Sequence, residues 1–168
     1  MLALSLIIVG ILLRFVPHAP NFTPVAAIAL FSGAYLNKRY AFIVPLVLMI
    51  TSDLFIGLHN VVIFTWGAFA LITILGLWLK KHRSVLGITA KSLVSAIIFY
   101  LVSNFGVWLM GWYPKTPKGL IDCYVMGLPF IRNFTVATLF YALAFFGLYE
   151  SVAYFVKDKK LAKALLTN

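Results

Sequence analysis

Long apolar runs separated by short polar connections make up most of this chain. A helix that spans a membrane needs roughly 17–25 mostly apolar residues. The pattern predicts an all-α integral membrane bundle of about six transmembrane helices, at residues 2–16, 24–36, 41–57, 61–79, 92–111 and 130–156. The second run is short for a full span, so we expect that helix to be tilted little or sheltered by its neighbours.

The basic residues predict how this bundle is oriented. Ten of the fourteen Lys and Arg residues follow the second, fourth and sixth helices, at 37–40, 80–91 and 157–163. Membrane proteins retain positive loops in the cytoplasm. We therefore expect both termini to be cytoplasmic, with a single transmembrane domain at 1–156 and a basic cytoplasmic tail at 157–168.

Composition supports the membrane class and excludes others. Hydrophobic residues make up 63% of the chain, charged residues 11%, and the mean hydropathy is +1.02. Soluble domains average about a quarter charged residues. The net charge of +10 is explained by the topology, so we expect a lipid bilayer and no nucleic acid as partner. A multi-pass protein of a bacterial inner membrane fits best. The single cysteine, Cys123, allows no internal disulfide.

Polar and aromatic residues gather in the outer half of the predicted bundle. Polar groups inside a bilayer are costly and usually face a cavity or a partner. We therefore expect an outward-facing substrate pocket lined by Arg14, His18, Asn21, Asp53, Asn104, Trp108, Tyr113, Asp122, Tyr124 and Asn133. Two alternatives remain open: a structural ion pair of Asp53 with Arg14 or Arg132, and an interfacial belt of aromatic side chains.

Two outer connections are long. The first holds three prolines between Arg14 and Pro24, which suits a stiff lid or pocket wall. The fifth, residues 112–129, is rich in turn-forming residues, and 119–128 is expected to fold back as a re-entrant or interfacial segment. Asp122 would then lie in a loop.

No catalytic pattern is present. The chain has no Gly-x-Ser-x-Gly, no His-Glu-x-x-His and no phosphate-binding glycine loop, so we expect neither an enzyme nor a cofactor. No two of the three histidines have metal-ligand spacing, so no metal site is expected. Glu150 is expected at the inner interface, paired with Lys157 or another base, and a role in proton coupling is the alternative.

The order of these residues resembles a widespread family of small membrane proteins of unknown function that are catalogued only as candidate transport proteins. The resemblance is carried by Arg14, Pro-His-x-Pro-Asn-Phe-Thr-Pro-Val-Ala-Ala at 17–27, Ser52-Asp53, Ser103-Asn104-Phe-Gly-Val-Trp108, Tyr113-Pro-x-Thr116, Gly119-Leu120, Cys123-Tyr124, Pro129-Phe130 and Asn133. It covers nearly the whole chain.

A looser similarity is to the substrate-binding S components of energy-coupling-factor (ECF) vitamin transporters. These are small six-helix proteins with both ends inside, and the similarity implies a ligand site under the first, third and fifth loops. S components often dock their energising membrane module through an alanine-spaced face on the first helix. Here that helix has no regular Ala-x-x-x-Ala, and the small pair is Ala29 and Gly33 on the second helix. Coupling to an energising module therefore stays open.

These observations together predict a membrane solute-binding or transport protein. Its pocket would face outward and hold a small polar or amphipathic molecule, such as a vitamin or another metabolite. Two other classes remain: a structural or assembly subunit of a larger membrane complex, whose small-residue faces dock neighbours, and an intramembrane enzyme that acts on lipid. A stable partner without any ligand response would favour the subunit.

Overall fold

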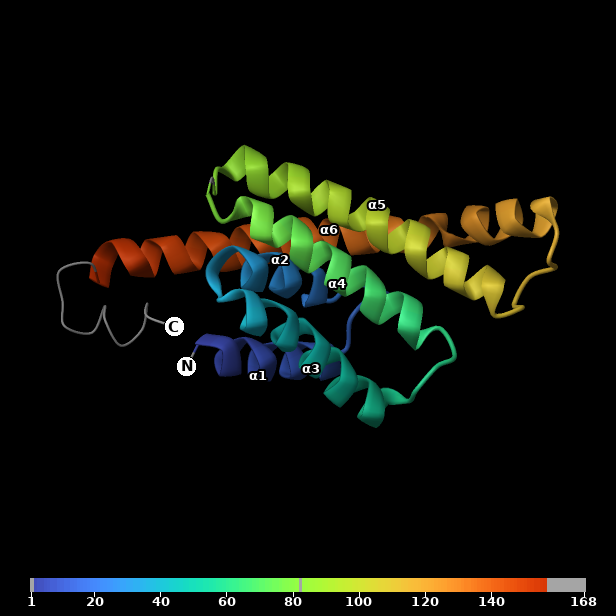
Figure 1. The fold of residues 1–168 in the computed structure, drawn as a ribbon, viewed down its shortest axis with the longest axis horizontal. Coiled ribbons are helices and arrows are strands. Elements are labelled where there is room, and N and C mark those ends of the chain that lie inside the picture. The colour runs from blue at the N-terminus through green and yellow to red at the C-terminus, as the bar shows by residue number, and fades with distance from the viewer. Residues whose placement is uncertain (1, 82, 157–168) are drawn as a thin grey trace.

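The computed structural model describes residues 2–81 and 83–156, so the predicted basic tail at 157–168 lies outside the described residues. It contains α1 (Leu2–Phe15), α2 (Val25–Tyr35), α3 (Lys38–Ile56), α4 (Val62–Leu79), α5 (Val85–Leu109) and α6 (Pro117–Val156). No strand occurs in the described part of the chain. The all-α prediction is confirmed, with six helices in chain order (Figure 1).

Four of these helices are long and apolar enough to cross a membrane. They are α3, α4, α5 and α6, and the 25 residues of α5 alone span ~37 Å at the usual helical rise. The helices α1 and α2 are apolar but shorter. Large hydrophobic side chains remain exposed around the bundle, as a surface that faces lipid requires; examples are Leu12, Phe55, Ile63, Leu101 and Phe140.

The shortest helix, α2, lies at the centre of the bundle. Every residue from Val25 to Ala34 is buried, and α2 contacts each of the other five helices. With 11 residues it is ~16 Å long, about half the hydrocarbon thickness of a bilayer. The expectation that the second helix is sheltered is confirmed.

Glycine allows α2 and α4 to meet backbone to backbone. A Cβ atom added at Gly76 would lie 2.3 Å from the carbonyl oxygen of Leu30, and one added at Gly33 would lie 2.5 Å from that of Thr73. Helices in membranes associate closely where small residues line the contact. The predicted small pair Ala29 and Gly33 is therefore buried inside the bundle, so it is not an outer docking face.

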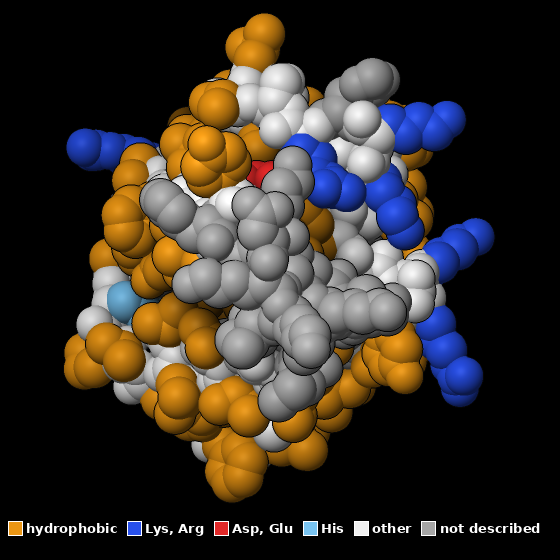
Figure 2. All heavy atoms as spheres, turned by 90° about the vertical axis from the view of Figure 1, so that its left-hand side faces the viewer, with side chains coloured by type: hydrophobic (Ala, Val, Ile, Leu, Met, Phe, Trp, Pro, Cys, Tyr) orange, Lys and Arg blue, Asp and Glu red, His pale blue; other side chains and the backbone are white. Residues whose placement is uncertain are grey.

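Consecutive helices run in alternating directions, so the molecule has two distinct ends (Figure 1). The connections after α1, α3 and α5 lie at one end, called the loop end here. The opposite end holds the start of α3 and the α4–α5 connection, with Lys38, Arg39, Lys80, Lys81 and Arg83. We call it the basic end, and Figure 2 shows Lys and Arg side chains projecting from its rim.

A small network closes the basic end around Glu150. The hydroxyl of Tyr35 donates a hydrogen bond to Glu150 Oε1, and Arg83 Nη1 lies 3.6 Å from the same oxygen. The Arg83 guanidinium also lies over the Tyr35 ring, 4.2 Å from its centroid. Glu150 is therefore paired with Arg83 at the basic end of the bundle. The alternative partner, Lys157, lies outside the described residues.

Three helices begin earlier than the hydrophobic pattern predicts: α3 by three residues, at Lys38, and α5 and α6 by more. Helix α5 starts at Val85 instead of 92, because Ser84 caps it by accepting a hydrogen bond from the Gly87 amide (3.0 Å). Helix α6 starts at Pro117 instead of 130, and Thr116 caps it in the same way through the Gly119 amide (3.1 Å). The predicted re-entrant segment at 119–128 is therefore wrong: these residues form the first turns of α6.

Candidate functional site

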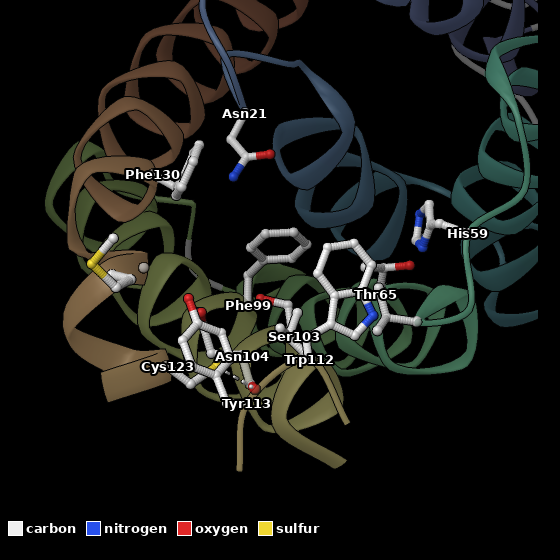
Figure 3. Close-up of a pocket in the computed structure, with 14 residues that line it drawn as sticks. Asn21, His59, Thr65, Phe99, Ser103, Asn104, Trp112, Tyr113, Cys123 and Phe130 are labelled. Atoms are coloured by element: carbon white, nitrogen blue, oxygen red, sulfur yellow. Dashed lines mark hydrogen bonds between the residues drawn. The ribbon is translucent and has the colours of Figure 1, made fainter. Parts of the chain in front are cut away.

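A cavity of about 390 Å³ opens at the loop end between α4, α5 and α6 (Figure 3). Three helix connections, those after α1, α3 and α5, also contribute to it. It is lined by Asn21, His59, Val61, Thr65, Phe99, Ser103, Asn104, Val107, Trp112, Tyr113, Cys123, Met126, Gly127 and Phe130. Sites for small molecules usually measure about 300–1,000 Å³ and combine apolar walls with a few placed polar groups.

The short central helix explains why there is space here. Because α2 is far shorter than its neighbours, the bundle has no central helix near the loop end. The connection 16–24, which precedes α2, enters this region instead and brings Asn21 to the cavity. In Figure 3 the amide of Asn21 approaches from one side, and Ser103 and Asn104 approach from the other.

Asn21 is held in an unusual backbone conformation. Its φ is 61°, the left-handed region, which asparagine tolerates better than most residues because its side chain can bond locally. The neighbouring carbonyl of Pro20 accepts a hydrogen bond from Asn133 Nδ2 on α6 (3.2 Å). Asn133 is thus a positioning residue, because it ties the proline-rich connection to α6 beside the cavity.

The side-chain amide of Asn104, a residue of α5, is held by a hydrogen bond within α5 and packs against Gly127 of α6. Its Nδ2 donates to the carbonyl oxygen of Tyr100 one turn earlier (2.8 Å). A Cβ atom at Gly127 would lie 2.5 Å from Asn104 Oδ1, so only glycine leaves room for this amide. Within the described residues, Oδ1 and the hydroxyl of Ser103 have no hydrogen-bond partner. They remain available to a ligand.

A smaller recess of about 20 Å³ extends the cavity between α5 and α6. It is large enough for about one water molecule. Asn21, Ser103 and Asn104 line both the recess and the main cavity. Three neutral polar side chains therefore converge on its inner end.

Aromatic rings form the walls from the recess, which Phe99 and Phe130 also line, out to the mouth. Phe99 stacks on Phe134 behind it, with centroids 4.2 Å apart and planes at 8°, and this fixes the ring orientation. Phe130 comes from α6, and Trp112 and Tyr113 come from the α5–α6 connection. Rings placed around one space favour a ligand with a flat apolar face.

The predicted pair Arg14 and Asp53 lies outside this cavity. Arg14 Nη2 donates to Asp53 Oδ1 at 2.8 Å, and Trp66 Nε1 donates to Asp53 Oδ2 at 2.9 Å. Asp53 is 2% exposed and therefore enclosed. The expected single space shared by Asp53 and Asn104 does not form, because the ion pair with α1 and the bond to α4 use both carboxylate oxygens. The geometry of Asp53 therefore matches the alternative of a structural ion pair, and its partner is Arg14.

Four other predicted residues do not line the cavity. Trp108 Nε1 donates to the Pro114 carbonyl oxygen (3.0 Å), and Tyr124 Oη donates to that of Leu101 (2.8 Å). Asp122 lies on α6, where its carboxylate is 3.6 Å from Lys118 Nζ. His18 lies in a separate hollow between the connection 16–24 and Tyr141. Of the ten predicted residues, the cavity brings together Asn21, Asn104 and Tyr113.

Several lining residues were not among those predicted. Phe99, Ser103 and Val107 are spaced by four, so they share one face of α5, and this spacing is visible in the sequence. Gly127 and Phe130 were missed because they fell in a segment expected to be a loop. Among the described residues, no group of three or more His, Cys, Asp and Glu could hold a metal ion.

The chain belongs to a family of unknown function, DUF6580, whose model matches residues 1–162. No curated protein and no solved structure matches it.

Proposed function

We propose that this member of the DUF6580 family is a multi-pass membrane protein that binds a small polar or amphipathic solute in its loop-end cavity and serves in its transport. The observation that carries the proposal is the cavity itself. Available amide and hydroxyl groups lie at its inner end, and aromatic rings line its walls. In this proposal the protein is organised as an S-component-like binding protein with six membrane helices.

In this proposal the loop end faces outward and the basic end faces the cytoplasm of a bacterial cell. The support is the placement of basic side chains, since Lys and Arg are retained on the cytoplasmic side. The described basic end carries Lys38, Arg39, Lys80, Lys81 and Arg83. Both termini would then be cytoplasmic, and α1 and α2 would complete the six helices within the membrane.

This orientation predicts which side of the membrane a cysteine probe will report. In a Cys123→Ala background, Lys118→Cys should react with a membrane-impermeant maleimide in intact spheroplasts, because Lys118 is exposed at the loop end. Lys81→Cys, exposed at the basic end, should react only after lysis. The opposite labelling pattern would refute the orientation, and labelling of both in intact spheroplasts would refute alternating topology.

Solute binding predicts a ligand-dependent gain in stability. A ligand at one hundred times its Kd stabilises a protein by about 2.7 kcal/mol. For a chain of this size that raises the Tm by about 5–10 °C. The measurement is the thermal unfolding of detergent-purified protein across a metabolite panel.

Gly127→Ala and Gly147→Ala provide a matched pair on α6. The first must displace the Asn104 amide, whereas a Cβ atom at Gly147 meets nothing within 4 Å. We expect a metabolite that raises the Tm of the wild type to raise the Tm of Gly147→Ala as well, but not that of Gly127→Ala. If no metabolite shifts the wild type, or if Gly127→Ala responds equally, the cavity is not the binding site. The unliganded Tm of each variant controls for folding.

A further inference from the structure

The chemistry of the cavity narrows the class of its ligand, and this inference rests on the proposed function. The fourteen lining residues include no Asp, Glu, Lys or Arg. This is notable in a chain of net charge +10, whose basic residues could have supplied a counter-charge. Burying a charged group without a partner costs far more than burying a neutral polar one.

Five charged side chains of the loop-end region are engaged by other groups. Arg14 and Asp53 neutralise one another 2.8 Å apart. Lys118 and Asp122 form a pair on the exposed side of α6, and Lys115 donates to the Leu109 carbonyl oxygen beside the Trp108 ring. None of the five lines the cavity, and neither does Arg132, which is exposed on α6. An ionic ligand would therefore find no counter-ion there.

The neutral groups have a definite arrangement instead. Asn21, Ser103 and Asn104 surround the inner recess, where amides and a hydroxyl can both donate and accept hydrogen bonds. The ring of Phe99 has a fixed orientation, and Trp112 stands at the mouth (Figure 3). A flat ring fits between such aromatic walls, and its polar edge would reach the recess.

We propose that the cavity selects an uncharged, planar ring compound that carries an amide-like edge with both donor and acceptor groups. The edge pairs with Asn21, Ser103 and Asn104, and the ring stacks against the aromatic walls. His59 lies at the exposed rim and does not reach the inner recess. The selectivity therefore comes from the absence of any fixed charge at the inner end.

Three isosteric probes test the charge. Quinoline-3-carboxamide is neutral, quinoline-3-carboxylate is an anion and quinoline-3-carboxamidine is a cation, and their shapes are nearly the same. We expect the carboxamide to bind at least about tenfold more tightly than either ion, because each ion would be buried without a partner. Binding is measured by thermal shift and by equilibrium titration, alongside the metabolite panel.

Two variants make the test specific to this cavity. Ser103→Asp places a carboxylate at the inner recess and should shift preference to the carboxamidine. Trp112→Leu should weaken binding of the aromatic carboxamide. Trp78→Leu should not, because Trp78 is equally exposed, at 66% against 65% for Trp112, but lies at the basic end under Lys91.

The outcomes separate the inference from the proposed function. Equal or tighter binding of the carboxylate or carboxamidine by the wild type overturns the inference and leaves solute binding intact. If the metabolite of the panel that binds most tightly is charged, the inference is likewise overturned and solute binding stays intact. Failure of every probe and every metabolite to bind overturns solute binding, and the inference with it. Preference for the carboxamide that Ser103→Asp reverses supports both.

Discussion

Replacing Gly76 with alanine is expected to cause a large loss of stability, because the added methyl group would meet the backbone of the central helix. The new Cβ atom would lie 2.3 Å from the carbonyl oxygen of Leu30 and 3.0 Å from its Cα atom. Overpacking a core usually costs about 1–3 kcal/mol, when side chains can adjust. Here the obstacle is backbone on the central helix α2, so we expect a loss above about 3 kcal/mol.

The matched control is Gly67→Ala on the same helix, where a Cβ atom meets nothing within 4 Å. It should be neutral or stabilising by up to about 1 kcal/mol, because alanine favours helix over glycine. Unfolding in mixed micelles titrated with SDS, together with the yield of monodisperse protein, measures both. If Gly76→Ala unfolds at the same SDS fraction as the wild type, the close contact of α2 and α4 is wrong.

Removing the carboxylate of Asp53 is the second change with a large expected effect. Asp53→Ala would leave the Arg14 guanidinium, 15% exposed, without its charge partner and Trp66 Nε1 without its acceptor. Breaking a buried ion pair by deleting one member typically costs about 3–5 kcal/mol, since the other charge is then uncompensated. We expect a loss of this size in the same SDS titration.

Two control variants distinguish the cost of leaving a buried charge unpaired from the cost of removing a side chain. Asp122→Ala breaks the exposed pair with Lys118, whose side chain is 88% exposed, and should change stability by less than about 1 kcal/mol. The double variant Arg14→Met with Asp53→Ala should recover part of the loss, because no charge is left unpaired. A double variant no more stable than Asp53→Ala would mean that the charge is not the cause.

The hydrophobic pattern predicts most of the helices because lipid imposes a simple rule on length and polarity. The ends of α1, α2 and α4 fall within one residue of the expected positions. The starts of α3, α5 and α6 come earlier than expected. For α5 and α6 the reason is that Ser84 and Thr116 cap the helices before segments that were expected to be connections. The sequence Thr116-Pro117 is in fact a favourable helix start, since proline suits the first position.

The candidate site is less accessible to sequence reasoning, for a physical reason. Hydropathy and charge indicate the depth of a residue in the membrane but not the direction of its side chain. Asp53 and Asn104 were expected at similar depth, yet Asp53 turns to Arg14 and Trp66 while Asn104 turns to α6. That direction depends on how each helix is rotated by its neighbours, which only packing decides.

The position of α2 has a consequence for how a cell makes this protein. The ribosome completes this 11-residue segment before it has synthesised four of the five helices that will enclose it. It is too short to be integrated securely as an independent span. Until those later helices have been synthesised, most of the surface that α2 buries in the finished bundle has no partner within the chain, because α1 is the neighbour that α2 contacts least. The interior of this bundle is therefore completed only by the parts of the chain that are made last.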